Sequence, residues 1–257
     1  MPEQRTPDDT MEAGAMGVDP MEAATHYFEA ITERLANLRK ANKRSIPAAA
    51  DIVADTVERD GIIRLYGSGH SQLLALEAVG RAGGYAGVHV IFDPGWGRAE
   101  QIEGFAAAVL RDEVLDPRDC LFVISNSGRN PAPIEVAMAG RAAGLPVIAV
   151  TALDYARQSR SRHSSGKSLH DLADVVLDTC AAPGDAVLEV EGAVVPTGAT
   201  STVLGAALLN AVLAESVAEL GRRGIEPPLV RSYNLDGSEA HNEGVMDRYR
   251  GRVRPTI

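Results

Sequence analysis

Two short segments of this 257-residue sequence place small polar side chains at spacings that suit an anion. Residues 67–71 (GSGHS) and residues 125–131 (SNSGRNP) each follow an apolar run and open a predicted helix. Glycines let the backbone approach a ligand closely, and hydroxyl and amide groups at the start of a helix can bind phosphate. The second segment offers two hydroxyls, two amides and a cation, which is more than a plain turn needs. We therefore interpret both segments as parts of an anion cradle.

A third segment, residues 196–202 (PTGATST), opens the last long helix of the predicted fold. Capping that helix needs only one of the four hydroxyls, so the surplus requires another explanation. Three hydroxyl-rich helix starts together indicate that the ligand is one small phosphate ester. The predicted phosphate-binding residues are Ser68, Ser71, Ser125, Asn126, Ser127, Thr197, Ser201 and Thr202.

The first segment also admits an alternative interpretation as a dinucleotide-binding turn. Asp93 ends the next apolar run, where the acid that binds a ribose would lie. However, Gln72 stands where the glycine fingerprint needs Gly or Ala for helix–strand packing. A plain strand-to-helix turn explains the GSG residues alone equally well. The nucleotide alternative predicts that cofactor binding survives the loss of Ser125 and Ser127.

Five short apolar runs predict the strands that position these segments. They cover residues 62–67, 88–93, 120–125, 146–151 and 174–179. Ala-rich stretches of suitable length for crossover helices lie between most of them, at 71–82, 99–110 and 131–143. This alternation predicts an α/β fold with three layers, in which a doubly wound parallel sheet is covered by helices on both faces. Such sheets bind ligands at the carboxyl ends of their strands, where the first two segments fall.

The remaining residues are predicted to flank this core. Residues 1–20 are acidic and lack the apolar centre of a signal peptide, so we expect a disordered lead-in. Periodic apolar residues predict an N-terminal extension of two helices within 21–60. The predicted core spans 61–222, and its last helix runs over about 200–220. The polar tail, 223–257, is predicted to contribute to the site or to a dimer interface.

Composition narrows the classes of partner. The sequence has 25 basic and 35 acidic residues and a formal net charge of -10, which argues against nucleic acid and anionic membranes. We find no apolar run that approaches the roughly 18 residues of a membrane helix. Cys120 and Cys180 lie in apolar runs without zinc-like spacing, so we expect two buried thiols. A cytoplasmic protein without metal or cofactor is the expectation.

The segments GSGHS, SNSGRNP and PTGATST resemble the phosphosugar-binding segments of the sugar isomerase (SIS) domain family. The resemblance covers about residues 45–220, and SNSGRNP is its most specific part. It implies a flavodoxin-like parallel-sheet fold, often dimeric, that binds sugar phosphates. By position, the resemblance implies phosphate contacts from Ser71, Ser125, Ser127, Thr197 and either Ser201 or Thr202. Members of the family include ketose–aldose isomerases, glucosamine-6-phosphate synthase, N-acetylmuramic acid 6-phosphate etherase and transcription-factor sensors.

Catalytic SIS chemistry removes a proton beside the carbonyl of an opened sugar, which directs attention to acids and bases. Glu77 lies six residues after Ser71 on the same predicted helix. Isomerase and etherase relatives carry their acid about one helical turn further on, where this sequence has Arg81. Glu77 is thus either a catalytic base or the partner of Arg81 in an ordinary surface pair at i and i+4.

Other acids and bases lie after the second strand and in the tail. Glu100 and Glu103 follow a glycine-rich segment, and we favour Glu103, which is predicted at the inner end of the next helix. Residues 238–243 (SEAHNE) place His241 among carboxylates, which would raise the pKa of its imidazole toward the range for proton transfer. In SIS dimers a late histidine often completes the neighbouring site, so the resemblance implies that role for His241.

These observations predict a homodimer with shared sites that acts on a hexose or N-acetylhexosamine 6-phosphate by removing the C2 proton. A C2 hydroxyl leads to aldose–ketose isomerisation, whereas a C2 acetamido group blocks that route and leads to loss of the C3 substituent. Elimination needs an acid as well as a base, and the surplus of carboxylates favours such a lyase. A phosphosugar sensor would need no base near C2. The candidate catalytic residues are Glu77, Glu103, Glu239 and His241, and the candidate sugar contacts are His70, Asn130 and Glu243.

Overall fold

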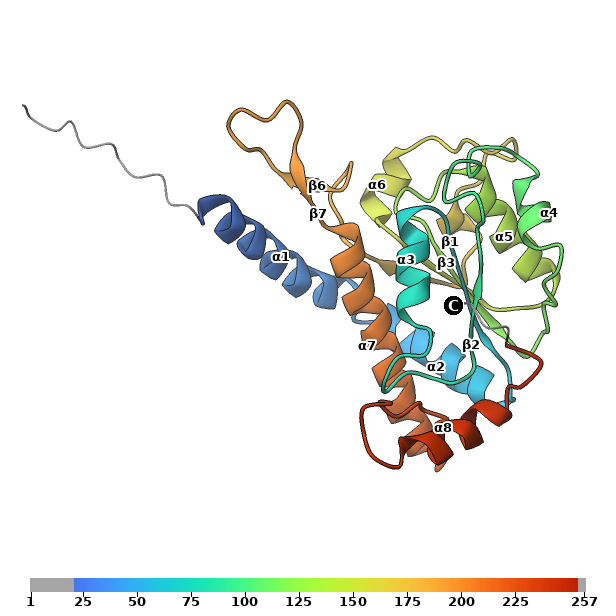
Figure 1. Ribbon diagram of the computed structural model, residues 1–257. Coiled ribbons are helices and arrows are strands. Elements are labelled where there is room, and N and C mark those ends of the chain that lie inside the picture. Colours follow the sequence, from blue (N-terminus) through green and yellow to red (C-terminus); the bar gives the residue numbers. More distant parts are fainter. Residues whose placement is uncertain (1–20, 254–257) are drawn as a thin grey trace, which may run out of the picture.

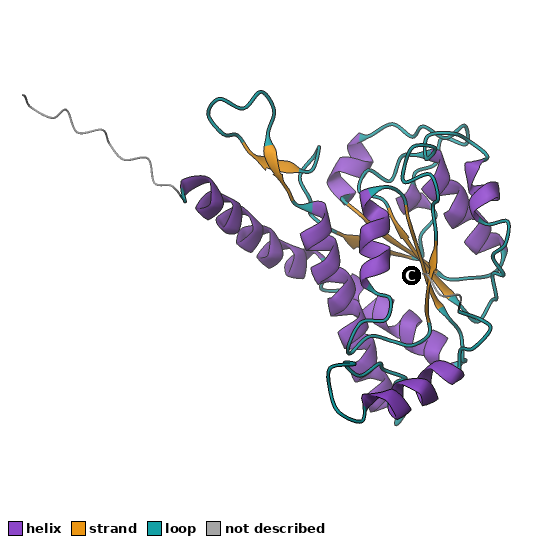
Figure 2. Ribbon diagram, viewed as in Figure 1, coloured by secondary structure: helices purple, strands orange, loops and turns teal. Residues whose placement is uncertain are grey.

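The computed structural model describes residues 21–253, which are built around a five-stranded parallel sheet (Figure 1). Helices lie on both sides of this sheet (Figure 2). Apolar, β-branched residues suit strands that are covered on both faces. The predicted doubly wound α/β fold is therefore confirmed. The strands are β1 (Ile63–Gly67), β2 (Val88–Ile91), β3 (Cys120–Ile124), β4 (Val147–Thr151) and β5 (Val175–Asp178), in the spatial order β2-β1-β3-β4-β5.

The order of the strands fixes where a ligand can bind. β1 pairs with β2 on one side and β3 on the other, so Ile63 lies opposite both Val88 and Cys120. The chain therefore winds in opposite directions from β1, and the carboxyl ends of β1 and β3 form the switch point at which such sheets bind ligands. The segments 67–71 and 125–131 begin at these two strand ends.

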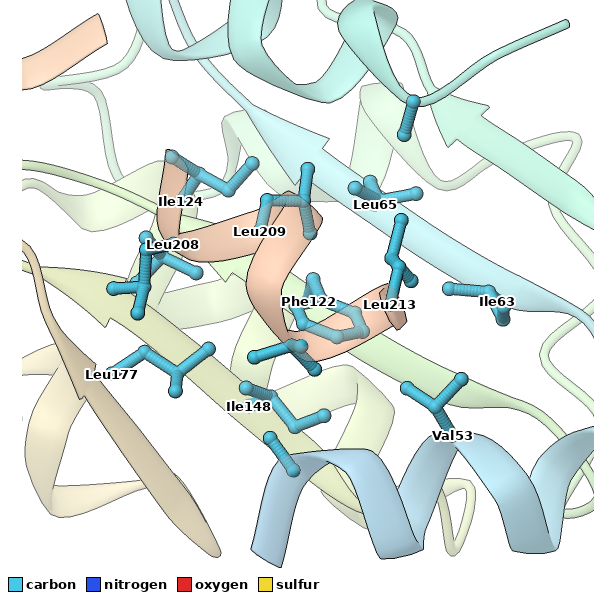
Figure 3. Packing of buried hydrophobic residues seen from close by; sticks show 14 of the residues in the cluster. Val53, Ile63, Leu65, Phe122, Ile124, Ile148, Leu177, Leu208, Leu209 and Leu213 are labelled. Carbon is cyan, nitrogen blue, oxygen red and sulfur yellow. The ribbon is translucent and has the colours of Figure 1, made fainter. Parts of the chain in front are cut away.

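Two hydrophobic cores hold the layers together. Alternate residues of a strand point to opposite faces, so Phe122 packs in one core and Leu121 in the other. Figure 3 shows Phe122 and Ile148 between Val53 and Leu208, which come from two helices that pack on the same face of the sheet. One face is covered by α2 (Ser45–Glu58), α3 (His70–Glu77) and α7 (Ser201–Arg222), and the other by α4 (Phe105–Val109) and α5 (Pro131–Ala142).

Helix α1 (Glu22–Ala41) and an antiparallel hairpin project together from this core (Figure 1). The hairpin, which we call the arm (residues 186–199), consists of β6 (Ala186–Leu188) and β7 (Thr197–Ala199). The Tyr27 hydroxyl of α1 donates to the backbone oxygen of Ala199 at 2.8 Å. At the other end of α1, the buried side-chain amide of Asn42 pairs with both backbone groups of Asp178, at 2.8 and 2.7 Å. Asn42 thus occupies the place of a neighbouring strand beside β5.

Several elements differ from the sequence predictions. The helix predicted at 99–110 is reduced to α4, because Gly104 adopts a φ of 87° and the side chain of Glu135 accepts the amide hydrogens of Gly104 and Ala106. Cys180, predicted to be buried, is partly exposed. The predicted lead-in, 1–20, lies outside the described residues. Elements absent from the predictions are the arm, α6 (Leu153–Gln158), a 3-10 turn (Leu169–Asp171) and α8 (Ser238–Asp247).

The sequence analysis found no unbroken apolar run of membrane-spanning length, but one helix within residues 21–253 is long and apolar enough to cross a membrane by length and composition alone. That helix is α7, whose most apolar 18-residue window has a mean hydropathy of 1.6. Helix α7 also packs against the sheet through Leu204 and Leu208, which are completely buried. Because core helices meet the same criterion, α7 is weak evidence for a membrane span.

Candidate functional site

A narrow pocket opens at the carboxyl ends of the central strands. Its volume of about 20 Å³ accommodates one water-sized group, so it can take part of a phosphate but no sugar ring. The walls come from the starts of α3 and α7 and from the ends of β3, β4 and β5. The lining residues are His70, Ser71, Leu74, Ile124, Asn126, Val150, Thr179, Ser201 and Thr202. The three predicted phosphate segments therefore meet at one place.

Several polar groups of this pocket lack partners within residues 21–253. The side-chain oxygen of Asn126 is buried and without a hydrogen bond. The hydroxyls of Ser71 and Thr202 make no hydrogen bond to another described residue. Helices α3 and α7 both start beside the pocket, so the positive ends of their dipoles lie near it. The hydroxyls of Ser71 and Thr202 can donate to a bound anion. The unpartnered oxygen of Asn126 is an acceptor and needs a donor, such as a hydroxyl group of the ligand.

A carboxylate caps the start of α7, whereas the sequence predicts a cap by one of the hydroxyls of residues 196–202. Asp185 accepts the amide hydrogens of Thr200 and Ser201 at 2.9 and 2.6 Å, and the Ser201 hydroxyl at 2.8 Å. Burial alone would raise the pKa of Asp185, but these hydrogen bonds outweigh it and lower the pKa. The Ser201 hydroxyl is therefore occupied, whereas the Thr202 hydroxyl stays available to a ligand. Thr197 lies exposed on the arm and does not line the pocket.

The other predicted phosphate residues shape the two loops. Ser68 is buried and donates its hydroxyl to Asp93. The Ser125 hydroxyl accepts the amide hydrogen of Gly128 at 3.2 Å, which closes the turn after β3. Ser127 is half-buried in that same turn. Of these serines, Ser68 and Ser125 thus already have partners within the protein.

Asp93 does not suit the ribose-binding role that it would have in a dinucleotide-binding site. The residue is completely buried, and its carboxylate accepts the amide hydrogens of Gly95 and Gly97 at 2.7 and 2.9 Å. Together with Ser68, these donors occupy the carboxylate from within the protein. A ribose would find no free acid here, so the structure removes the main support for a dinucleotide site.

Glu77 lies at the end of α3, and the pocket just described lies at its beginning. It forms the predicted ion pair with Arg81, and both side chains are about half-exposed. Glu77 also lines a larger cavity of about 250 Å³ between α3 and α7, together with Asn210 and Leu213. His70, which lines the small pocket, and Glu77, which lines the larger cavity, both lie on the exposed side of α3.

Glu103 does not lie at the inner end of a helix as predicted. Because α4 begins only at Phe105, Glu103 falls in the preceding turn and is exposed. Its carboxylate accepts the amide hydrogen of Ser164, and the hydrogen bonds from Ser164 lower the pKa of Glu103. Glu103 does not line either of the two cavities described above.

Glu100 is the more enclosed of the two acids that follow β2. Burial raises its pKa, and a hydrogen bond of 2.8 Å from the side chain of Asn130 opposes that effect only in part. Asn130 in turn accepts a hydrogen bond of 2.9 Å from Arg162. Asn130, a predicted sugar contact, therefore links Glu100 to Arg162, which lies in the loop after α6.

The candidate acids and base of the tail lie on α8, at the amino end of the sheet, whereas the pocket lies at the carboxyl end. Helix α8 continues into Arg248, which binds Asp60 before β1, and Tyr249, which packs against Gly87 before β2. Within one chain, His241 bonds through Nε2 to the backbone oxygen of Leu229 at 2.9 Å. The structure thus does not bring the α8 residues to the phosphate pocket of the same chain. Glu239 and Glu243 are exposed on this helix.

Comparison with known proteins identifies the family. A model of the SIS domain matches residues 26–152. A UPF0309 protein of Geobacillus thermodenitrificans is 41% identical over 236 residues, which cover 88% of this chain and 95% of that protein. A UPF0309 protein of Streptomyces coelicolor is 43% identical over 241 residues, with coverage of 90% and 96%. The chain belongs to the UPF0309 family and contains a SIS domain.

Solved structures share the fold of this SIS protein. The phosphoheptose isomerase of Neisseria gonorrhoeae superposes with a TM-score of 0.53 at 18% identity, over 78% of this chain and 100% of that one. The NanR protein of Vibrio vulnificus, complexed with ManNAc-6P, gives a TM-score of 0.50 at 14% identity, over 80% and 66% of the two chains. At these identities the likeness establishes the SIS fold alone.

Sequence reasoning missed the carboxylates that hold the loops of this SIS domain. Asp93, Glu135 and Asp185 each accept two backbone amide hydrogens from segments around the site. Asp185 follows a glycine in a turn, which is an ordinary surface pattern. Only the position of Asp93, directly after a strand and before a glycine-rich loop, offered a signal.

Proposed function

We propose that this SIS protein binds a hexose or N-acetylhexosamine 6-phosphate and removes the proton at C2. The observation that carries the proposal is the convergence of Ser71, Asn126 and Thr202 on one pocket between two helix starts. The phosphate would sit across the mouth of this pocket, with an oxygen inside it. The hydroxyls of Ser71 and Thr202 provide donors for a phosphate dianion, and the start of α3 adds the positive end of a helix dipole.

The sugar would extend from the phosphate along the exposed side of α3. Ser71 and Glu77 are six residues apart, which corresponds to about 9 Å along a helix axis. That span matches the reach of an opened hexose from its phosphate to its first carbons. Leu73, which is 45% exposed between them, offers an apolar surface to the sugar chain.

Glu77 is then the base. Its carboxylate takes the C2 proton, and the electrons of the C2–H bond move toward the C1 carbonyl, which becomes an enolate oxygen. With an acetamido group at C2, the enolate expels the C3 hydroxyl, which leaves as water after protonation and creates a C2–C3 double bond. With a hydroxyl at C2, reprotonation at C1 gives the ketose. We favour elimination, because the sequence is rich in groups that could serve as the acid.

Elimination by this route requires a homodimer, since His241 and Glu239 lie far from the pocket of their own chain. The side of the molecule beside α3 and α7 exposes apolar residues, among them Leu73 and Val203 at 45% and 41%. Phe28 of α1 is 64% exposed. A second copy that covers these side chains could place His241 beside Glu77, and His241 would then protonate the leaving group.

Proton NMR in deuterated water with a panel of hexose and N-acetylhexosamine 6-phosphates tests the proposed reaction. Deuterium at C2 is expected, together with an olefinic signal for at least one N-acetylhexosamine 6-phosphate. A ketose spectrum would instead establish the isomerase. Line broadening without exchange at C2 would contradict an enzyme and support a phosphosugar sensor.

Mixing two inactive variants tests whether sites are shared between copies. Glu77→Gln and His241→Ala are expected to be inactive alone, and their mixture should recover about a quarter of the wild-type activity, because mixed dimers keep one intact site. Refolding the two variants separately before mixing provides the control. A mixture that stays inactive after refolding together would contradict a shared site.

A further inference from the structure

A buried carboxylate that the proposed chemistry does not use lies directly beneath the first phosphate loop. Asp93 is 0% exposed, and the amide groups of Gly95 and Gly97 donate to its two carboxylate oxygens at 2.7 and 2.9 Å. The Ser68 hydroxyl donates to the same carboxylate. A buried charge is costly unless donors surround it, and here three donors from two loops do so.

The backbone of Asp93 also reaches α3. Its amide group donates to the side-chain oxygen of Gln72, which is completely buried, at 2.6 Å. Asp93 therefore contacts the residues on both sides of the turn from Gly69 to Ser71. Through Ser68 it holds the end of the loop that leaves β1, and through Gln72 it holds the first turn of α3.

The loop after β2 presses against that same turn. A Cβ atom added to Gly97 would lie only 3.0 Å from the Cα atom of Gly69, so the two backbones are in direct contact. Both glycines have positive φ angles, 82° and 58°. Such close packing lets the loop of residues 93–97 brace the segment that carries Ser71.

We propose that Asp93 is a positioning residue, which holds residues 67–72 in the conformation that presents the Ser71 hydroxyl and the start of α3 to the phosphate. Ser68 then acts as a partner of Asp93 and makes no direct phosphate contact. The ligand in this inference rests on the proposed function, whereas the bracing of the loop does not. None of the groups bound by Asp93 belongs to the hydrophobic cores, so loss of its charge should act on the loop first.

The substitution Asp93→Asn tests this role, with Asp174→Asn as a matched control. Asp174 accepts the amide hydrogen of Val147 at 2.8 Å, but at the amino end of the sheet. For a hexosamine 6-phosphate, we expect KM to rise about tenfold in Asp93→Asn with kcat changed by less than about threefold. The control should keep the wild-type KM. A fall in kcat at unchanged KM would contradict positioning of the phosphate loop.

Trp96 provides a readout that needs no substrate. It is the only tryptophan of the sequence and is 50% exposed in the loop that Asp93 holds. Quenching of its fluorescence by acrylamide and hydrogen exchange at residues 67–72 should both increase in Asp93→Asn, and both should be unchanged in Asp174→Asn. Unchanged quenching and exchange in Asp93→Asn would overturn the inference.

The two proposals fail in distinguishable ways. If wild-type protein binds neither inorganic phosphate nor any sugar phosphate, the proposed function is wrong, while the fluorescence and exchange data still decide the role of Asp93. If Asp93→Asn does not fold, Ser68→Ala serves instead, since it removes one donor and keeps the charge. It should raise KM about threefold and leave kcat unchanged. An unchanged KM in Ser68→Ala would count against the inference.

Discussion

Polar groups at the two ends of the parallel sheet differ in whether they have partners within the protein. At the amino end, Arg64 pairs with Asp119 at 2.6 Å and with Glu113 at 3.1 Å, and Glu113 also meets His89 at 2.9 Å. Asp119 further accepts the amide hydrogen of Ile62 at 2.8 Å. At the carboxyl end, hydroxyls and an amide oxygen face a pocket without partners among the described residues.

The comparison separates polar groups whose partners lie within the protein from those that we propose bind a ligand. Buried charges at the amino end are neutralised by their neighbours, so they fix the loop before β3 against β1 and β2. Nδ1 of His89 and Nε of Arg252 are exceptions there, since both are buried without a partner in the described residues. At the carboxyl end, the internal carboxylates Asp93 and Asp185 bind backbone amides and hold the loops, while the hydroxyls of Ser71 and Thr202 have no partner among the described residues.

The largest effect is expected from the proposed base. Glu77→Gln should lower the rate of deuterium exchange at C2 by about 10²–10⁴-fold, because the amide cannot take the proton. Stability should hardly change, since the ion pair with Arg81 is exposed. Glu215→Gln, which breaks an exposed pair with Arg222, is the matched control and should keep the wild-type rate. Comparable exchange in Glu77→Gln would show that another residue is the base.

Breaking the network at the amino end should cost stability and leave binding unchanged. Asp119→Ala leaves the buried Arg64 without its nearest carboxylate, so we expect the free energy of unfolding to fall by about 3–5 kcal/mol. Urea denaturation measures this loss. The KM of the protein that remains folded should equal that of the wild type. A raised KM would indicate that the substrate binds at the amino end of the sheet, which would contradict our account.

Two threonines near the start of α7 sharpen the assignment of the phosphate contacts. Thr202 lines the pocket, whereas Thr197 lies exposed on the arm. Thr202→Ala should raise KM about tenfold through loss of a hydrogen bond to a charged group, and Thr197→Ala should leave KM unchanged. Equal effects of the two substitutions would mean that the arm reaches the ligand.

The smallest effect concerns the cap of α7. The pKa of Asp185 is lowered in the folded protein, so its carboxylate adds stability above its ordinary pKa of 3.8, and this contribution is lost as the pH falls through the folded value. Asp185→Asn should cost about 0.5–1 kcal/mol at neutral pH. The difference from wild type should shrink below pH 3.8 in urea titrations between pH 3 and pH 7. A constant difference over that range would argue against an ionised cap.

Local sequence was sufficient to predict the sheet and the loops that follow β1 and β3. Short β-branched runs specify the strands, and the glycine and serine residues that follow them specify loops at the carboxyl ends. The carboxylates that hold these loops could not be predicted, because they act across the chain. Asp185 reaches Thr200 over 15 residues, and Glu135 reaches Gly104 over 31.

The tail illustrates the same limit. The sequence predicts that His241 lies among acids, but its place depends on how Arg248 and Tyr249 dock at the amino end of the sheet. Helix α8 therefore does not line the pocket of its own chain, and our proposal brings His241 there from a second copy. Docking of this kind depends on contacts between distant segments, which no periodic pattern in the tail reveals.

A crystal structure with a bound hexosamine 6-phosphate tests the central claim most directly. The account predicts phosphate oxygens within hydrogen-bond distance of Ser71 and Thr202, with C2 of the sugar facing Glu77. The structure also has a cavity at the amino end of the sheet that Arg118 and Arg252 line. A phosphate bound in that cavity would contradict the account.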